Sequence, residues 1–364
     1  MKKYKLTITL TTLALFASLL SGCFGNNNNA ADSTQITSGN SSQYETLEPL
    51  SQTYFIFDTV VNVKIYDTRA TKDNLQDIEN ILKNIDQKIS RNQENSEISK
   101  VNAKSGIAAV KVSEDTYDLV SKALEYAERT DGLFDPAIGK LVGLWNIGHE
   151  GAHVPAKEDI AEALLLSDYR KVEMNDDTHE IYLQEKGMDI DLGSIGKGYA
   201  ADVIYDYLAG KGFNSAIIDL GGNVFAMGSK PGGKKWTVGV QDPTQERGIS
   251  IGTIQVEDKT IVTSGIYERF FIENGKLYQH ILNPTTGYPV DNNINSVTIV
   301  TNRSTDADAL STTLFVLGIE EGLKFIENTP DAEALFISKD KKLYGTSGFK
   351  ELLNKTNDSY TFAN

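Results

Sequence analysis

Cysteine is almost absent from this sequence, with one residue, Cys23, among 364. A lone thiol has no partner for an internal disulfide, and a zinc site built from cysteines needs several of them. Histidine is scarce too, with four residues, and none of these shows the His-Glu-x-x-His spacing of helical zinc sites. Disulfide scaffolds and zinc sites of these kinds are therefore excluded.

Long apolar runs are absent except near the N-terminus. Leu6–Leu20 has no charged residue and follows Met1–Lys5, which carries three lysines. The run is shorter than the roughly 20 apolar residues that span a bilayer and ends in small residues, so residues 1–22 are predicted to be a signal peptide. It closes with Leu20-Ser21-Gly22-Cys23, which resembles the lipobox of bacterial lipoproteins. We expect Cys23 to be lipidated and the mature chain to be exported and anchored to the cell membrane. The alternative is a core cysteine in a short apolar helix.

Basic side chains are outnumbered by acidic ones. The chain has 35 lysines and arginines against 50 aspartates and glutamates, a formal net charge of −15 at pH 7. Removing residues 1–22 takes away three lysines and no acid, which leaves −18. This balance argues against nucleic acid as a partner. Any anionic ligand must be held by a local site rather than by the overall field.

Residues 23–52 have too few apolar side chains to build a core. They are rich in Asn, Ser, Thr and Gln, including Asn26–Asn29, and cannot bury enough surface to offset the entropy of ordering. We predict a flexible tether that follows Cys23. The remaining residues, 53–364, approach the upper length that one core supports, so we expect one large domain of two joined lobes.

Apolar periodicity predicts the elements of that domain. Residues 55–66 alternate in their second half and predict an opening strand, whereas 72–89 and 113–129 repeat apolar residues at three and four and predict amphipathic helices. Residues 188–192 are predicted as a short strand that leads through glycines into a helix at 196–209. A hairpin is expected at 170–183, strands at 215–219, 236–240, 250–256, 260–264, 268–273, 277–282, 295–301 and 333–338, and helices at 305–317 and 319–328. Because helices and strands do not alternate regularly, we predict an α+β fold of mainly antiparallel sheets layered with helices.

The stretch Asp189–Tyr199 combines carboxylates with glycines at the start of a predicted helix. Three glycines let the backbone approach a ligand just where the free N–H groups of the helix point outward, which predicts an anion site. The glycine spacing is too short for a P-loop. Ser194–Lys197 also fits the Ser-x-x-Lys pattern of acyl-serine enzymes, but the other elements of that class do not follow it. The remaining alternative is a packed strand-to-helix turn without a ligand.

A second stretch, Thr305–Thr313, opens an apolar helix. Asp308 and Thr312 are four residues apart and share one helix face, so a carboxylate and a hydroxyl can converge on one cation. Oxygen-only ligation indicates Mg²⁺, which keeps waters and phosphate oxygens in its other positions. The alternative is that both side chains only cap the helix.

A third stretch, His280–Pro289, runs from a strand into a loop with proline and glycine. Of the four histidines, only His280 has this setting, which makes it the candidate general base, although a lone histidine is more often structural. Residues Gly132–Pro136 and Leu144–Asn146 can supply an apolar wall for a ring system, and core packing explains them equally well.

Taken in order, these stretches resemble the ApbE family of FAD:protein FMN transferases. The resemblance runs from about Thr53 to Gly318, and lipoprotein export is common in that family. The matching elements are Phe57–Thr59, Ser90–Asn92 with Ser96–Ser99, Gly132–Asp135, Asp191–Tyr199, Asp219–Asn223, Thr263–Gly265, His280–Pro289 and Ala307–Gly318. Eight elements in one order form a specific signal.

The resemblance implies a role for individual residues. Mg²⁺ would be held by Asp308, Thr312 and the backbone carbonyl of Ser194, and would bridge the pyrophosphate of FAD. His280 looks like the proposed general base of the family. Contacts with FAD are implied for Phe57, Asn92, Leu133, Phe134, Asp135, Asp191, Lys197 and Leu282.

The resemblance also implies a reaction, transfer of the FMN half of FAD to a Thr or Ser hydroxyl of a partner protein with release of AMP. Acceptor segments of the family resemble Asp-x-x-x-Gly-Ala-Thr/Ser, and because this chain contains none, it is not expected to modify itself. Asn92 stands where several relatives carry Tyr, which leaves room for FAD hydrolysis. Two alternatives therefore stay open: an FAD pyrophosphatase that gives free FMN and AMP, and a flavin-binding lipoprotein without turnover.

Overall fold

The structure is a computed structural model and describes residues 48–364. These residues form one compact unit. The predicted signal peptide, the lipidation at Cys23 and the tether up to residue 47 lie outside the described residues and stay predictions. A search of residues 48–364 finds no helix that is both long and apolar enough to cross a membrane.

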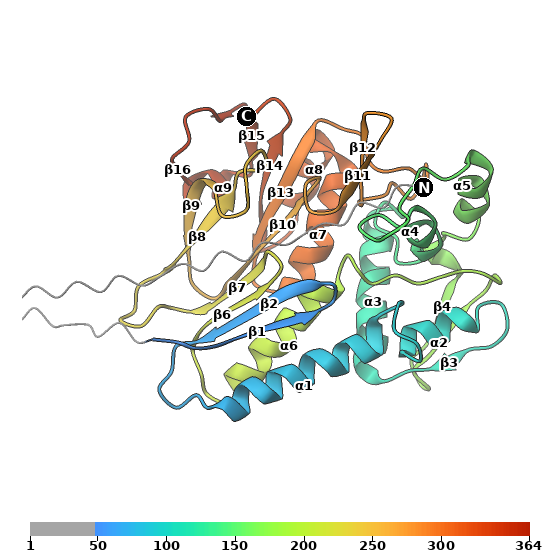
Figure 1. Cartoon of the computed structure of the whole chain (residues 1–364), viewed down its shortest axis with the longest axis horizontal. Coiled ribbons are helices and arrows are strands. Elements are labelled where there is room, and N and C mark those ends of the chain that lie inside the picture. Colours follow the sequence, from blue (N-terminus) through green and yellow to red (C-terminus); the bar gives the residue numbers. More distant parts are fainter. Residues whose placement is uncertain (1–47) are drawn as a thin grey trace, which may run out of the picture. The chain divides into compact units, whose positions relative to one another are not determined.

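Figure 1 shows how the helices and strands are arranged. The helices are α1 Lys72–Ile89, α2 Glu97–Ala103, α3 Glu114–Arg129, α4 Gly139–Trp145, α5 Lys157–Leu164, the 3₁₀-helix η1 Tyr169–Lys171, α6 Gly196–Gly210, α7 Ser304–Leu317, α8 Ile319–Glu327 and α9 Ser347–Leu352. The strands are β1 Leu50–Ile56, β2 Thr59–Ile65, β3 Val110–Lys111, β4 Val172–Asn175, β5 Glu180–Leu183, β6 Ser215–Leu220, β7 Asn223–Gly228, β8 Trp236–Gln241, β9 Ser250–Val256, β10 Lys259–Gly265, β11 Phe270–Glu273, β12 Lys276–Gln279, β13 Ile294–Thr301, β14 Glu333–Ser338, β15 Lys342–Gly345, β16 Asn354–Lys355 and β17 Thr361–Phe362.

The largest sheet has nine strands in the order β1-β2-β6-β7-β10-β13-β14-β15-β17. Its neighbouring strands pair antiparallel except for β15 and β17, which are parallel. All eight residues of β13 are buried, as expected of a strand that is covered on both faces. The predicted α+β class with mainly antiparallel sheets is confirmed.

Each face of this sheet has its own hydrophobic core. On one face, α1, α6 and α7 contribute Leu82, Ile204 and Leu314 to the larger core. On the other face, a three-stranded sheet of β8, β9 and β16 contributes Trp236 and Ile254 to a second core. Two cores on one shared sheet allow a domain of this length to fold as a single unit.

The predicted opening strand is in fact a hairpin. β1 and β2 are joined at Phe57 and Asp58, whose φ angles are 54° and 53°, the left-handed conformation that two-residue hairpin turns of type I′ require. Such turns usually contain Asn or Gly, and the absence of both hides this turn in the sequence. β1 starts at Leu50, opposite Ile65, inside the tether that was predicted to end at residue 52.

The predicted strand at 188–192 is wrong. An isolated bridge joins Asp189 to Ile138, the Asp191 N–H donates to the Pro136 carbonyl, and side chains described below hold the rest of the segment. The sequence analysis also missed β7, whose glycine and alanine have low strand propensity, and the short helices α2, α4, α5 and α9. The other predicted helices and strands are present, with ends that differ by a few residues.

Candidate active site

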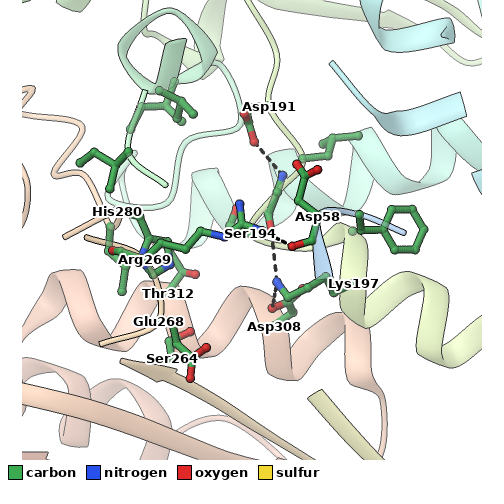
Figure 2. A pocket seen from close by; sticks show the side chains of 18 of the residues that line it. Asp58, Asp191, Ser194, Lys197, Ser264, Glu268, Arg269, His280, Asp308 and Thr312 are labelled. Atoms are coloured by element: carbon green, nitrogen blue, oxygen red, sulfur yellow. Dashed lines mark hydrogen bonds and ion pairs between the residues drawn. The ribbon is translucent and has the colours of Figure 1, made fainter. Parts of the chain in front are cut away.

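A cavity of about 790 Å³ lies where the first turn of α6 and the Asp308–Thr312 stretch of α7 meet the β1–β2 turn and the ends of the β11–β12 hairpin. Its volume is in the range of small-molecule sites. The cavity is lined by all twelve residues that were predicted to contact FAD, hold Mg²⁺ or act as the base, and Figure 2 shows several of them from close by. These residues are Phe57, Asn92, Leu133, Phe134, Asp135, Asp191, Ser194, Lys197, His280, Leu282, Asp308 and Thr312. Their roles stay predictions.

α6 and α7 cross closely beside the cavity, and Gly198 makes this approach possible. A Cβ at Gly198 would lie 2.1 Å from the Ser304 carbonyl oxygen, so only glycine fits there. Asp202 of α6 then caps α7. Its carboxylate accepts hydrogen bonds from the Ser304 and Thr305 backbone N–H groups at 2.8 Å each. This crossing fixes the start of α7 and with it the position of Asp308.

The crossing also leaves the Ser194 carbonyl free. In a regular helix the N–H of Gly198 donates to the carbonyl four residues earlier, which is that of Ser194. Here this N–H donates to Asp308 Oδ2 instead, at 3.0 Å. Among the described residues no backbone N–H donates to the Ser194 carbonyl. Its oxygen is therefore available to a ligand beside a buried carboxylate.

These donors fit the predicted metal. Within residues 48–364, no three His, Cys, Asp or Glu side chains gather in a way that could hold an ion. The predicted set does not need such a cluster, because it has one carboxylate, one hydroxyl and one carbonyl, all oxygen donors. Mg²⁺ prefers oxygen ligands and usually keeps several places for water or phosphate. Asp308, Thr312 and Ser194 suit that preference.

Lys197 brings a positive charge to the same place. Its Nζ lies 3.4 Å from Asp308 Oδ1 and 3.4 Å from the carbonyl oxygen of Gly193. Asp308 is 3% exposed, so this partly exposed amine is its nearest charged contact. The arrangement places a partly exposed cation next to a buried anion at the cavity (Figure 2).

His280 follows β12 and reaches the cavity next to Arg269. Burial and the positive charges of Lys197 and Arg269 together lower the pKa of His280 from 6.5 to about 4, and burial has the largest effect. Its Nδ1 lies 3.3 Å from the Arg269 carbonyl oxygen. A proton on Nδ1 that is donated to this carbonyl leaves Nε2 with a free lone pair. The imidazole is then neutral at pH 7 and able to accept a proton.

Two side chains that the sequence analysis did not single out hold the segment around Asp191. Asn102 on α2 donates to the Ile190 carbonyl at 3.0 Å and accepts from the Ile190 N–H at 2.8 Å, as a neighbouring strand would. Arg91 forms an ion pair with Asp189 and lies 3.5 Å from Asp191. Asp191 in turn accepts a hydrogen bond from the Gly193 N–H at 2.7 Å. Burial raises the pKa of Asp191, and the Arg91 cation opposes this shift.

The residues that the resemblance implies as FAD contacts include both buried and exposed side chains. Phe134 and Asp135 are buried, and burial raises the pKa of Asp135 to about 6. The Asp135 carboxylate accepts hydrogen bonds from the Ala137 and Tyr169 N–H groups at 2.7 and 3.2 Å, so it fixes the loop after α3. Asn92 is exposed at the rim.

The sequence analysis missed a charged group at the rim. Arg247 pairs with Glu268 at 2.6 Å, and Arg269 donates to the Asp58 carbonyl at 3.4 Å, which joins the β1–β2 turn to the start of β11. All four residues line the cavity. They come from loops and strand ends in separate parts of the sequence, so no local sequence pattern predicts that they lie together.

Comparisons with known proteins agree with this architecture. A profile of the ApbE family matches residues 57–336. The FAD:protein FMN transferase of Treponema pallidum is 37% identical over 314 residues, which cover 82% of this chain and 87% of the relative. That of Klebsiella pneumoniae is 36% identical over 263 residues, 72% of this chain and 81% of the relative.

Solved structures lead to the same group. The crystal structure of the ApbE protein from Thermotoga maritima is 33% identical and superposes with a TM-score of 0.77 over 85% of this chain and 100% of that chain. The flavin transferase ApbE from Vibrio cholerae is 27% identical, with a TM-score of 0.76 over 84% of this chain and 99% of that chain. Fold and sequence thus point to one class of protein, the bacterial flavin transferases. The chain belongs to the ApbE family, and the resemblance noted from the sequence is confirmed.

Proposed function

We propose that this chain transfers the FMN moiety of FAD to a Thr or Ser hydroxyl of a partner protein and releases AMP. Membership of the ApbE family and the names of the relatives support FMN transfer to a protein. The observation that carries the proposal is one cavity in which the free carbonyl of Ser194, the Asp308 carboxylate and a neutral His280 lie together. A passive flavin-binding protein has no need of that combination.

The proposed reaction balances as a single displacement at phosphorus. The acceptor hydroxyl loses its proton to Nε2 of His280 and forms a bond to the FMN phosphorus. The bond between this phosphorus and the bridging pyrophosphate oxygen breaks, and AMP leaves with that oxygen. His280 suits the first step because its imidazole is neutral near pH 7. Lys197 would contact pyrophosphate oxygens when FAD binds and competes with Asp308 for its amine.

Mg²⁺ belongs to the same proposal. Asp308, Thr312 and the Ser194 carbonyl would hold it, and when bound it would neutralise charge on the pyrophosphate oxygens. The α6–α7 crossing positions Asp308 and leaves the Ser194 carbonyl free without the ion, because Asp202 caps α7 and Gly198 allows the close approach. Pre-positioned donors reduce the cost of assembling the site when the ligands arrive.

The acceptor and the location are further parts of the proposal. The acceptor is a second protein with an Asp-x-x-x-Gly-Ala-Thr/Ser-like segment, since residues 1–364 contain no such stretch. The chain acts outside the cytoplasm, anchored to the cell membrane through lipidated Cys23. Leu20–Cys23 and the apolar run before it support this location.

FAD hydrolysis is the second candidate function. Asn92 is exposed at the rim and is smaller than the Tyr that several relatives carry, so water has a route to the cavity when no acceptor covers it. In that reaction water takes the place of the acceptor hydroxyl, and FMN and AMP are released in equal amounts.

Chromatography of the small-molecule products tests the proposal. The exported domain is incubated with FAD and Mg²⁺, with or without a peptide that contains Asp-x-x-x-Gly-Ala-Thr. A transferase releases AMP mainly when the peptide is present and leaves little free FMN. Equal amounts of free FMN and AMP, with or without peptide, would identify a pyrophosphatase. Absence of AMP in both samples would contradict both reactions.

A further inference from the structure

Four lysine or arginine side chains line the cavity, and one of them has no acidic partner. Arg91, Lys197 and Arg247 each form an ion pair with a carboxylate, as described above. In the part of the chain that the structure describes, the fourth, Arg269, forms no ion pair, and its guanidinium donates one hydrogen bond, to the Asp58 carbonyl at 3.4 Å. That distance is long for an N–H···O bond, and a guanidinium has five N–H donors. Arg269 therefore keeps most of its donors for a ligand.

Arg269 and the candidate base stand on the same side of the β11–β12 hairpin. The ladder pairs Phe270 with Gln279 and continues by one step, since the His280 N–H donates to the Arg269 carbonyl oxygen at 3.1 Å. Residues opposite each other in an antiparallel pair have their Cβ atoms about 4.5–5.5 Å apart on one face. Both side chains line the cavity, and Figure 2 shows that of Arg269 extending from beside His280 toward Asp58.

The aliphatic part of Arg269 is packed, so its direction is set before a ligand arrives. A Cβ at Gly148, in the loop after α4, would lie 3.0 Å from Cδ of Arg269 and 3.4 Å from its Cβ and Cγ. The backbone at Gly148 therefore lies against the stem of this arginine. A side chain whose stem is already held loses less conformational entropy when its charged end binds a ligand.

The charge of Arg269 acts on the candidate base and on the segment of Asp191. Burial is the main cause of the lowered pKa of His280, and the charges of Lys197 and Arg269 add to it. Burial raises the pKa of Asp191, and Arg91 and Arg269 oppose this shift. Lys197 and Arg269 thus disfavour the imidazolium form of His280 in the free protein. A phosphate bound to these two cations would reduce that effect and favour proton transfer from the acceptor hydroxyl to His280.

We propose that Arg269 binds a non-bridging oxygen of the FMN phosphate of FAD and so holds the attacked phosphorus beside His280. This proposal rests on the displacement at phosphorus proposed above and adds a substrate contact to it, in which no bond to Arg269 forms or breaks. A hydroxyl that lies about 3 Å from the imidazole and about 3–3.5 Å from the phosphorus puts this phosphorus roughly 6 Å from His280. The neighbouring arginine reaches that far, and its planar fork of N–H donors matches phosphate oxygens.

Binding of FMN and of riboflavin, measured by flavin fluorescence with Mg²⁺ present, tests this contact because the two ligands differ only in that phosphate. Arg269→Gln removes the guanidinium, and Arg69→Gln is the control, which removes the same charge from an exposed residue outside the cavity lining. Arg269→Gln should weaken FMN binding at least about ten-fold, as loss of a hydrogen bond to a charged group usually does, and leave riboflavin binding unchanged. Arg69→Gln should change neither. Equal weakening for both flavins would overturn the proposal, since it would show that Arg269 only holds the β1–β2 turn.

The rate of AMP release from FAD is a second measurement, which does not need riboflavin to bind. With Mg²⁺ and a peptide that contains Asp-x-x-x-Gly-Ala-Thr, Arg269→Gln should lower kcat roughly 10²-fold, because a donor to the transferring phosphoryl group is lost. Arg269→Lys keeps the charge and should recover part of the loss. Release by Arg269→Gln at the rate of Arg69→Gln would overturn the proposal. A rise in the KM for the peptide alone would overturn it too and would assign Arg269 to the acceptor.

These outcomes separate this proposal from the proposed function. An unsubstituted protein that releases no AMP from FAD would contradict the proposed reaction itself. Normal AMP release by Arg269→Gln, with FMN bound as tightly as by Arg69→Gln, would contradict the role of Arg269 alone.

Discussion

At the scale of a single residue, His280 illustrates how burial keeps a candidate base neutral. Its pKa of about 4 lies below the ordinary 6.5 because the imidazolium form loses hydration and meets Lys197 and Arg269. The neutral form therefore contributes stability that is fully present above pH 6.5 and is lost as the pH falls through about 4. Over the range from pH 8 down to about 5 the side chain stays neutral.

The first prediction concerns the pH profile of transfer. Because kcat/KM reports ionisations of the free enzyme, it should show no loss due to His280 between pH 8 and about 5. His280→Ala should retain FAD binding and lose roughly 10²- to 10⁴-fold in transfer rate, the usual contribution of a general base. Stopped transfer assays at several pH values measure both. A limb near pH 6.5 that disappears in His280→Ala would contradict the depressed pKa, and an unchanged rate would remove the base role.

Asp308 gives the second prediction, which concerns the metal. Asp308→Asn keeps an oxygen that can accept from the Gly198 N–H but removes the negative charge. Mg²⁺ affinity, measured by calorimetry, should fall at least ten-fold because a carboxylate is the only anionic ligand of the proposed set. AMP release from FAD should fall with it.

Asp306→Asn is the control for that experiment. Asp306 lies two residues earlier on α7, is partly exposed, and contacts Lys122 and Tyr126 rather than the cavity. It should leave Mg²⁺ affinity unchanged. An Asp308→Asn protein that binds Mg²⁺ as tightly as the Asp306→Asn protein would show that the ion is held elsewhere.

Individual site residues also show which contacts can be predicted from the sequence and which cannot. The pair Asp308 and Thr312 is visible in the sequence because positions four apart share a helix face. Arg91 and Asn102 meet Asp189 and Ile190 only through contacts that span 98 and 88 residues. No periodicity encodes such contacts.

At the scale of elements, periodic helices were predictable and irregular segments were not. α1 and α3 lie where repeats at three and four placed them. The segment 188–192 has the composition of a strand, but its backbone bonds to the Asn102 side chain and to Pro136 instead of to a strand. The turn at Phe57 and Asp58 lacks the usual glycine or asparagine. Local propensity predicts the secondary structure of a segment correctly only where tertiary contacts favour the same structure.

The third prediction tests the crossing of α6 and α7. Gly198→Ala would place a methyl group 2.1 Å from the Ser304 carbonyl oxygen. Overpacking of this kind typically costs about 1–3 kcal/mol, and the free energy of unfolding from urea titration should fall by that amount. Gly210→Ala on the same helix is the control, since its Cβ would meet nothing within 4 Å. That change should be neutral or stabilising. Equal stability in the two variants would contradict the tight crossing.

At the scale of the whole molecule, the cavity joins segments from the first strand to α7. The strand order β1-β2-β6-β7-β10-β13 pairs β2 with β6, which lies some 150 residues later in the chain, and puts the still later β10 and β13 in the same sheet. Hydrophobic patterns predicted most of these strands but not their order, because pairing depends on long-range contacts. Only the resemblance to a family brought the scattered site residues together before the structure did.

The net charge of the whole chain also bears on how FAD is bound. The net charge of −15 repels FAD, which is itself an anion, so affinity must come from the local donors of the cavity. Lys197, Arg269 and Arg247 are the basic residues that line it together with Arg91. Acidic residues line the cavity as well, so contacts with a phosphate ligand are proposed to come from individual basic side chains rather than from a positive field.

Intact-mass analysis of the acceptor is the measurement that tests the central claim most directly. A peptide with Asp-x-x-x-Gly-Ala-Thr is incubated with the exported domain, FAD and Mg²⁺, and its mass is recorded with and without EDTA. The account predicts a gain of one FMN on the peptide that disappears with EDTA. An unmodified peptide beside free FMN and AMP would contradict transfer and establish hydrolysis in its place.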